Sequence, residues 1–155
     1  MRTVGVSSFI YFFCFYAWCK TSVRIASFNV ENYLVCDRWI DGRFVKNYPK
    51  PENAKDALRR LLKKINPDIL ALQEIGTEPF LKELQNDLKA EGLHFPFSAF
   101  LEAKDPARHL AILSKLPFKA APANHQLSFS YKQKLEYVKR GLLEVVFENE
   151  NRIWR

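Results

Sequence analysis

The stretch Pro67–Ile75 reads PDILALQEI, and it joins a short apolar run to a charged end. A turn signal precedes the run, and a bounded apolar run of this length is typical of a strand buried on both faces. The run ends in Gln73 and Glu74, and a carboxylate is costly to bury unless it is paired or bound to a metal. Open α/β sheets place ligands at the carboxyl ends of their strands, so Glu74 is a candidate binding residue. The alternative is that Glu74 simply leaves the sheet into solvent.

A second predicted strand also ends in a polar residue. Val23–Tyr33 reads VRIASFNVENY. Its first half alternates as strands do, and Asn29 follows where the strand should end. Between the two strands, Glu52–Ile65 places apolar residues on one helical face and basic residues mostly on the other. A strand, a helix and a strand with short connections form a crossover unit. Asn29 and Glu74 then stand at the ends of two strands, and both have side chains able to bind a cation that prefers oxygen ligands.

Taken in order, RIASFNVEN, a helix and PDILALQEI resemble the start of the endonuclease/exonuclease/phosphatase family, which has the deoxyribonuclease I-like fold. A third stretch, Asp105–Phe118, reads DPARHLAILSKLPF, and it is similar to a family strand that ends in Ser and a basic residue before a Pro. The resemblance implies an α/β fold, the N-terminal half of a two-sheet β-sandwich flanked by helices. It covers residues 23–155, an incomplete family domain.

The resemblance also implies a metal site. By motif, Asn29 and Glu74 correspond to family residues at a catalytic divalent cation, expected here to be Mg²⁺, with Mn²⁺ or Ca²⁺ as substitutes. Glu74 would bind the ion through a carboxylate oxygen, and Asn29 would hold a water of the ion or a phosphate oxygen. Glu31 would add a contact around the site. Arg108 is a candidate substrate-binding residue, which would contact phosphate.

The family assigns the activation of water to a His in a later motif. His94, His109 and His125 do not match that motif, and His109 is expected to be a hydrogen-bonded structural residue. The family's Asp-x-Asn and Asp-His pairs also do not appear after Glu74. We therefore expect residues 20–155 to be a truncated domain, and the 155-residue chain alone to lack significant phosphodiesterase activity.

The activity implied for the complete protein is Mg²⁺-dependent hydrolysis of a phosphodiester, with a nuclease as the leading interpretation. The expected partner is a phosphodiester substrate such as nucleic acid, and no stable protein partner is implied. The formal charge of +7 fits an anionic partner, although charge alone does not identify it. The same site residues suit a phospholipid or sphingomyelin phosphodiesterase or a phosphatase. An alternative from another class is a secreted, non-catalytic module that binds polyanions.

The remaining segments are assigned from turn signals and periodicity. Leu34–Lys50 is expected to be a loop that turns at Asp41-Gly42. It is basic and aromatic, so it either contacts substrate phosphates or bases, or is a solvated connection with a packed Trp39. The other expected elements are a helix at Thr77–Glu91 capped by Thr77, a strand at His94–Leu101, a loop or irregular strand at Ala120–Tyr137, and a hairpin of Gly141–Phe147 with Arg152–Trp154.

The N-terminal segment, residues 1–19, reads as a secretory signal peptide. Arg2 supplies a short positive region, an apolar run follows, and Ala17 and Cys19 are small enough for a cleavage pattern. The protein is therefore expected to be exported, to the periplasm or outside the cell. The alternative is an uncleaved anchor, because the core of the segment is unusually aromatic. After cleavage only Cys36 remains, so the fold must rely on its core rather than on an internal disulfide.

We predict that residues 1–19 are removed on export, because the apolar run is short for a membrane span. N-terminal sequencing of the exported protein should begin near Lys20. An intact Met1 on a membrane-embedded product would contradict this prediction.

Overall fold

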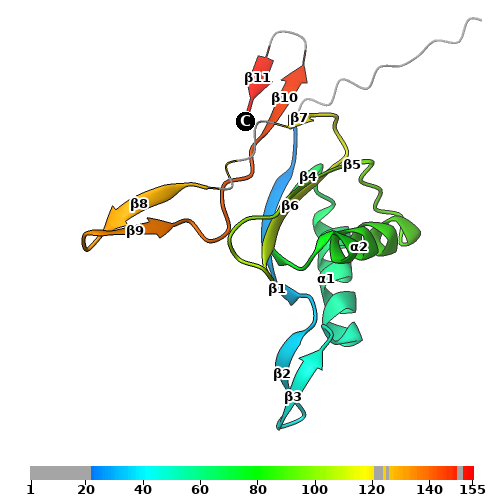
Figure 1. Cartoon of the computed structure of the whole chain (residues 1–155). Coiled ribbons are helices and arrows are strands. Elements are labelled where there is room, and N and C mark those ends of the chain that lie inside the picture. Colours follow the sequence, from blue (N-terminus) through cyan, green and yellow to red (C-terminus); the bar gives the residue numbers. More distant parts are fainter. Residues whose placement is uncertain (1–21, 121–123, 125, 150–151) are drawn as a thin grey trace, which may run out of the picture.

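The computed structural model describes residues 22–120, 124, 126–149 and 152–155, which form a mixed α/β fold (Figure 1). Its centre is a four-stranded sheet. The order across the sheet is β1 (Ile25–Tyr33), β4 (Ile69–Ile75), β6 (His109–Ser114) and β5 (Phe97–Leu101). β1 and β4 run parallel, whereas β6 is antiparallel to both of its neighbours. The predicted signal peptide lies outside the described residues, and no helix in the described part is long and apolar enough to cross a membrane.

The helices begin and end close to where the sequence predicts. α1 (Glu52–Ile65) has the predicted bounds and connects the parallel strands β1 and β4 as a crossover. It ends because Asn66 takes a left-handed conformation with φ of 48°, immediately before a proline. α2 (Glu78–Ala90) follows β4, and Thr77 stands at the capping position. The prediction that the Thr77 side chain caps this helix is wrong, because Thr77 makes no side-chain hydrogen bond there.

Both helices pack on one face of the central sheet and form the main core. Alternate residues of each strand point to this face, so Leu70, Leu72 and Leu113 meet the leucines of the helices. Each fully buried leucine stabilises the fold by roughly 1.5–3 kcal/mol. The buried cluster consists of Val30, Tyr33, Leu58, Leu62, Leu70, Leu72, Ile75, Leu81, Leu84, Leu88, Leu93, Phe95, Ala111 and Leu113.

A smaller sheet packs against the other face of the central sheet. Its order is β11 (Arg152–Trp154), β10 (Val145–Asn149) and β7 (Lys119–Ala120), and all of its pairs are antiparallel. The apolar residues Ile69 and Ile112 of the central sheet form a second buried cluster with Val145 and Phe147 of β10. The predicted pairing of the last two strands is confirmed, and the two sheets begin the expected two-layer arrangement.

The predicted loop at Leu34–Lys50 is in fact a hairpin of β2 (Cys36–Ile40) and β3 (Arg43–Tyr48). Asp41 and Gly42 form its turn, with φ of 51° and 76°, and two consecutive left-handed residues match the twist of the flanking strands. The turn signal was therefore correct, but the strands on each side of it were not expected.

The segment at Ala120–Tyr137, expected to be a loop or irregular strand, contains a second hairpin, of β8 (Ser128–Tyr131) and β9 (Lys134–Tyr137). Its turn residues Lys132 and Gln133 have φ of 48° and 62°, conformations that their side chains do not signal in the sequence. Figure 1 shows both hairpins projecting away from the central sheet.

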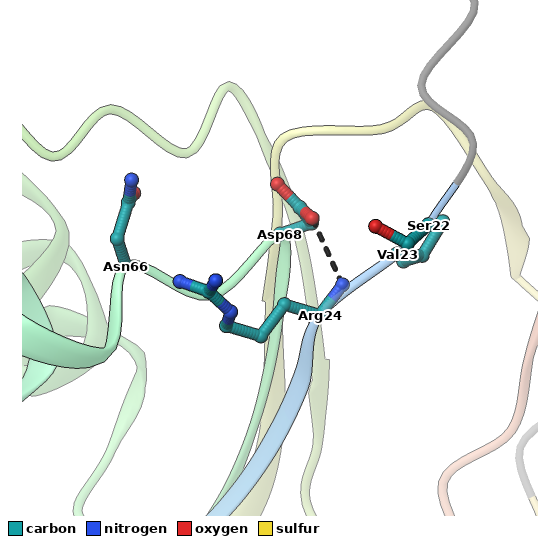
Figure 2. Close-up of a pocket in the computed structure, with 5 residues that line it drawn as sticks. All are labelled: Ser22, Val23, Arg24, Asn66 and Asp68. Atoms are coloured by element: carbon teal, nitrogen blue, oxygen red, sulfur yellow. Dashed lines mark hydrogen bonds between the residues drawn. The ribbon is translucent and has the colours of Figure 1, made fainter.

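The amino ends of β1 and β4 are tied together by a buried carboxylate (Figure 2). Asp68 is 2% exposed, and its Oδ2 accepts the backbone N–H of Arg24 at 2.9 Å. The backbone carbonyl of Arg24 in turn accepts the N–H groups of Asp68 and Ile69. These contacts border a hollow of about 410 Å³, which is lined by Ser22, Val23, Arg24, Asn66 and Asp68.

Arg59 joins the two helices through four carboxylates, and we predict that it stabilises the fold. Its side chain is 11% exposed, with Nε 2.7 Å from Glu91 Oε1 and Nη2 2.9 Å from Glu52 Oε1. Asp56 and Asp87 lie within 3.7 Å and 3.4 Å of it. Arg59→Met should lower the free energy of unfolding by about 2 kcal/mol, because the acidic groups lose a shared buried donor.

The matched control is Arg60→Met on the same helix. Arg60 pairs with Asp56 alone, and its side chain is 67% exposed. Its loss should change the free energy by at most about 1 kcal/mol. Urea denaturation followed by circular dichroism measures both variants, and equal effects would show that burial of Arg59 is unimportant.

Candidate active site

The carboxyl ends of β1 and β4 carry a break in the regular ladder. Asn29 pairs with Gln73, but the next pair is Tyr33 with Ile75, so residues 30–32 of β1 lie opposite Glu74 alone. Three residues here are left-handed although none is glycine: φ is 50° at Glu31, 54° at Asn32 and 64° at Glu74. Such conformations cost of order 1–3 kcal/mol each and persist only where the surroundings hold them. The prediction that the first strand ends at Asn29 is wrong, because the strand continues through this bulge.

Cationic side chains hold the backbone of the bulge. Lys50 is 8% exposed, and its Nζ donates to the carbonyl oxygen of Glu31 at 3.1 Å. The guanidinium of Arg38 donates to the carbonyl oxygens of Asn32 and Leu34. The Glu31 carbonyl and the Asn32 N–H belong to one peptide unit and point in opposite directions, so the Asn32 N–H faces Glu74 while the carbonyl faces Lys50. Burial lowers the pKa of the Lys50 ammonium, and the nearby Glu31 carboxylate opposes that effect.

Glu74 is the centre of the hydrogen bonds at the site. Its Oε2 accepts the backbone N–H of Asn32 at 3.2 Å, and its Oε1 accepts Arg140 Nη2 at 3.2 Å. The side chain of Asn29 also hydrogen-bonds to Glu74. Asn29 Oδ1 accepts the Glu31 N–H at 2.8 Å. Burial raises the pKa of Glu74, but the Asn29 hydrogen bond, the charge of Arg140 and the Asn32 N–H outweigh it and hold the pKa below its ordinary value.

The other side of the site is built around Asp105. Its Oδ1 accepts the N–H groups of Ala107 at 3.0 Å and Arg108 at 3.1 Å. Arg140 Nε lies 3.8 Å from Asp105 Oδ2, so one guanidinium bridges Asp105 and Glu74. Burial raises the pKa of Asp105, but the two backbone donors and the charges of Arg108 and Arg140 hold it below its ordinary value.

The structure brings the three predicted site residues together. Asn29 and Glu74 are in direct contact, and Arg108 reaches the same place because its Nε donates to Asn32 Oδ1 at 2.6 Å. The predicted contribution of Glu31 takes a different form. Its side chain is exposed, and it acts through its backbone N–H to Asn29 and its carbonyl to Lys50.

The histidines do not approach Glu74 as hydrogen-bonding partners in the described structure. His109 is 1% exposed and stacks edge-on against Phe100. The expectation that His109 is hydrogen-bonded is wrong, because neither ring nitrogen has a partner among the described residues. His94 is exposed on the connection between α2 and β5. His125 lies outside the described residues.

Sequence reasoning missed Asn32, Asp105 and Arg140. Asn32 stands in the VEN stretch near Asn29, and its role depends on a left-handed backbone, which Asn adopts more readily than most residues but which Glu31 and Glu74 share. Asp105 and Arg140 are distant in sequence and meet because the Asp105 N–H donates to the carbonyl of Lys139 at 2.7 Å. A partly buried carboxylate such as Glu74 predicts a basic partner, but the sequence contains 24 Lys and Arg residues and does not indicate which of them it is.

The donor atoms at the site are carboxylate and amide oxygens, which suit a hard cation. The described residues contain no group of three or more His, Cys, Asp or Glu side chains placed to hold a metal ion. Mg²⁺ needs no such group, because it keeps several waters and is commonly bound through one or two carboxylates together with substrate phosphate. The residues present therefore fit Mg²⁺, with Glu74 as the protein carboxylate and Asn29 beside it.

The polar site lies on a strained bulge at the carboxyl ends of two parallel strands. This is the edge at which α/β proteins bind ligands, so the fold and the site place the chain in that class. A sequence model of the Endonuclease/Exonuclease/phosphatase family matches residues 26–148, and the chain belongs to that family. Members of the family are generally hydrolytic enzymes that act on phosphate esters and usually use divalent metals. A search of curated proteins and a search of solved structures each gave no match.

The lowered pKa of Glu74 predicts an acid dependence of stability that Glu74→Gln removes. A carboxylate whose folded pKa lies below its ordinary value of 4.5 stabilises the fold above that value and loses the contribution as the pH falls through the folded pKa. The difference in unfolding free energy between the parent and Glu74→Gln should therefore shrink as the pH falls from about 5 toward 3.

Denaturant titrations at several pH values measure this difference. In an Asn29→Ala background the same difference should be smaller, because one of the contacts that lower the pKa is gone. A difference that does not change with pH would contradict the contacts assigned to Glu74.

Proposed function

We propose that this site hydrolyses phosphate esters with the help of Mg²⁺, that phosphodiesters of nucleic acid are its substrates, and that the protein acts after export. The observation that carries the proposal is the meeting of Asn29, Glu74, Arg108 and Arg140 at one point. A carboxylate and an amide for a cation, beside two guanidinium groups for a phosphate, are the parts that phosphoryl chemistry needs.

Glu74 and Asn29 are the residues proposed to hold the metal, and Mn²⁺ or Ca²⁺ can take its place. A divalent cation held here would stabilise negative charge that develops on the phosphate oxygens and on the leaving group. Arg140 Nη2 donates to Oε1 of Glu74. Metal and Arg140 therefore compete for the same carboxylate, and this competition can be measured.

Arg108 and Arg140 are the proposed phosphate-binding residues. Their side chains are 38% and 36% exposed, so both can reach a ligand from their present positions. A guanidinium donates two parallel hydrogen bonds to phosphate, and it stays charged at any pH at which the protein folds. The formal charge of +7 adds long-range attraction for a polyanion.

Neither His94 nor His109 is placed to act as a general base, since His94 is exposed on the connection between α2 and β5, and the buried ring of His109 has no polar partner among the residues that the structure describes. Groups that act as a unit in catalysis lose most of their effect when one is missing. We therefore expect the 155-residue chain to bind metal and phosphate but to turn over a phosphodiester only slowly.

Metal binding tests the proposal without relying on turnover. Binding of Mn²⁺, followed by its electron paramagnetic resonance signal, should weaken at least about tenfold in Glu74→Gln. Arg140→Met should strengthen it, because the variant frees a carboxylate oxygen. The matched control is Glu78→Gln, an exposed carboxylate at the start of α2, which should leave the affinity unchanged.

Hydrolysis of a labelled oligonucleotide with Mg²⁺ is the second measurement. Any turnover should disappear in Glu74→Gln and fall in Asn29→Ala and Arg108→Met. Turnover that persists in Glu74→Gln, or Mn²⁺ binding that is the same in all variants, would contradict the proposed site.

A further inference from the structure

The β2–β3 hairpin presents large aromatic side chains to solvent. Half-buried residues alternate with exposed ones along β2, and Val45 and Tyr48 are the half-buried residues of β3, so the ribbon has an inner and an outer face. On the outer face Trp39 is 73% exposed and Phe44 is 53% exposed. They are direct cross-strand neighbours with ring centroids 5.8 Å apart and planes at 63°. In an edge-to-face pair one ring offers only its edge, so flat aromatic surface remains free for a ligand. The expectation of a packed Trp39 is wrong.

The stability of the hairpin does not require an exposed Trp39–Phe44 pair. A cross-strand aromatic pair does help to hold a hairpin together. Small β-branched residues serve the same purpose on a solvent-facing ribbon without leaving an indole in water. The exposure of Trp39 therefore points to a ligand that covers it.

The hairpin is fixed to the candidate active site. Arg38, on the inner face, donates to the carbonyl oxygens of Asn32, Leu34 and Tyr48. The N–H of the same Asn32 donates to Glu74. Figure 1 shows the hairpin leaving the sheet at the end of β1, where the site lies. The hairpin that carries the aromatic pair is therefore fixed to the same backbone whose N–H reaches Glu74.

The charges beside the aromatic pair favour an anionic ligand. Arg43 and Lys46 are exposed, and neither forms an ion pair within the part of the chain that the structure describes. Of the two acidic residues of the hairpin, Asp37 is occupied by the N–H of Asn47 at 3.0 Å. The other, Asp41, lies in the turn. Aromatic faces flanked by unpaired cations are the features by which proteins bind single-stranded nucleic acid.

We propose that Trp39 and Phe44 form a base-stacking platform for single-stranded nucleic acid. This inference rests on the proposed function and names its substrate class, a polymer with unpaired bases. A membrane is a poorer occupant, because the tip of the hairpin consists of Asp41 and Gly42 and is followed by Arg43. Insertion of the aromatic pair into a bilayer would carry these polar residues with it.

The emission of Trp39 reports on the platform directly. The full chain with Trp18→Phe and Trp154→Phe retains Trp39 as its only tryptophan. A short oligothymidylate, added with EDTA so that nothing is hydrolysed, should quench this emission and saturate. A duplex of the same length should quench less, because its bases are already stacked. Equal quenching by the duplex would overturn the stacking mode.

Variants measure how much the platform contributes to binding. In Trp39→Ala, the affinity for a labelled oligothymidylate, followed by fluorescence anisotropy, should fall at least about fivefold. Trp39→Tyr should keep most of the affinity, because it keeps an aromatic face. The matched control is Ile153→Ala, which truncates a side chain that is 69% exposed on β11 and should change nothing. Unchanged thermal unfolding of Trp39→Ala shows that the loss does not come from misfolding.

The two proposals fail in different ways. If Mn²⁺ binding and hydrolysis depend on Glu74 but Trp39 does not respond to oligothymidylate, the inference is overturned while the proposed function stands. If Trp39 responds and Mn²⁺ binding does not depend on Glu74, the platform stands and the catalytic proposal fails. A blue shift of Trp39 with phosphatidylcholine–phosphatidylserine vesicles, without a response to oligothymidylate, would overturn the inference in favour of a membrane surface.

Discussion

The contact between Asn29 and Glu74 depends on left-handed backbone conformations, which break the regular pairing of β1 with β4 after Asn29. Asn29 pairs with Gln73, so in an unbroken pair of strands Glu74 would point to the opposite face of the sheet. The bulge removes this alternation. With Glu31, Asn32 and Glu74 all at positive φ, the Glu74 carboxylate turns toward Asn29 and receives the Asn32 N–H. The proposed metal-binding arrangement of Asn29 and Glu74 follows from this local departure from strand geometry.

The bulge links the stability of the fold to the site. On one side, hydrogen bonds from Lys50 to the Glu31 carbonyl and from Arg38 to the Asn32 carbonyl offset the strain of the bulge. On the other side β4 is held by the packing of Leu70 and Leu72 between the sheet and the helices. Lys50 and Arg38 both belong to the stretch between β1 and α1, and Arg38 lies on the hairpin that carries Trp39. One side chain of the hairpin therefore supports the backbone of the bulge.

The sequence predicts the parts of the fold that have strong periodicity. The apolar strands around Ile69 and Leu113 and the helix at Glu52–Ile65 are indicated by residue type. The order of two motifs, through the family they resemble, assigns Asn29 and Glu74 to one site. The two hairpins are missed because turns such as Lys132-Gln133 carry no signal and because their strands contain many charged residues. The bulge is missed because non-glycine residues rarely adopt positive φ, and nothing in the side chains of the VEN stretch compels it. Tertiary contact alone brings Arg140 to the site.

Arg140 explains how the Glu74 carboxylate can stay ionised in a partly enclosed site. The Glu74 side chain is 17% exposed, and leaving it ionised without a partner would be unfavourable. Arg140 is 3.2 Å from Glu74 and 3.8 Å from Asp105, and Arg108 is 3.9 Å from Asp105, so two guanidiniums balance two carboxylates. Under the proposed function, a divalent cation alone would leave the site with excess positive charge, and a phosphate alone with excess negative charge. Bound together, each offsets part of the charge that the other brings, and Arg140 could then turn from Glu74 to the phosphate. Metal and substrate should therefore each strengthen the binding of the other, and by the reciprocity of coupled equilibria they should do so by the same factor.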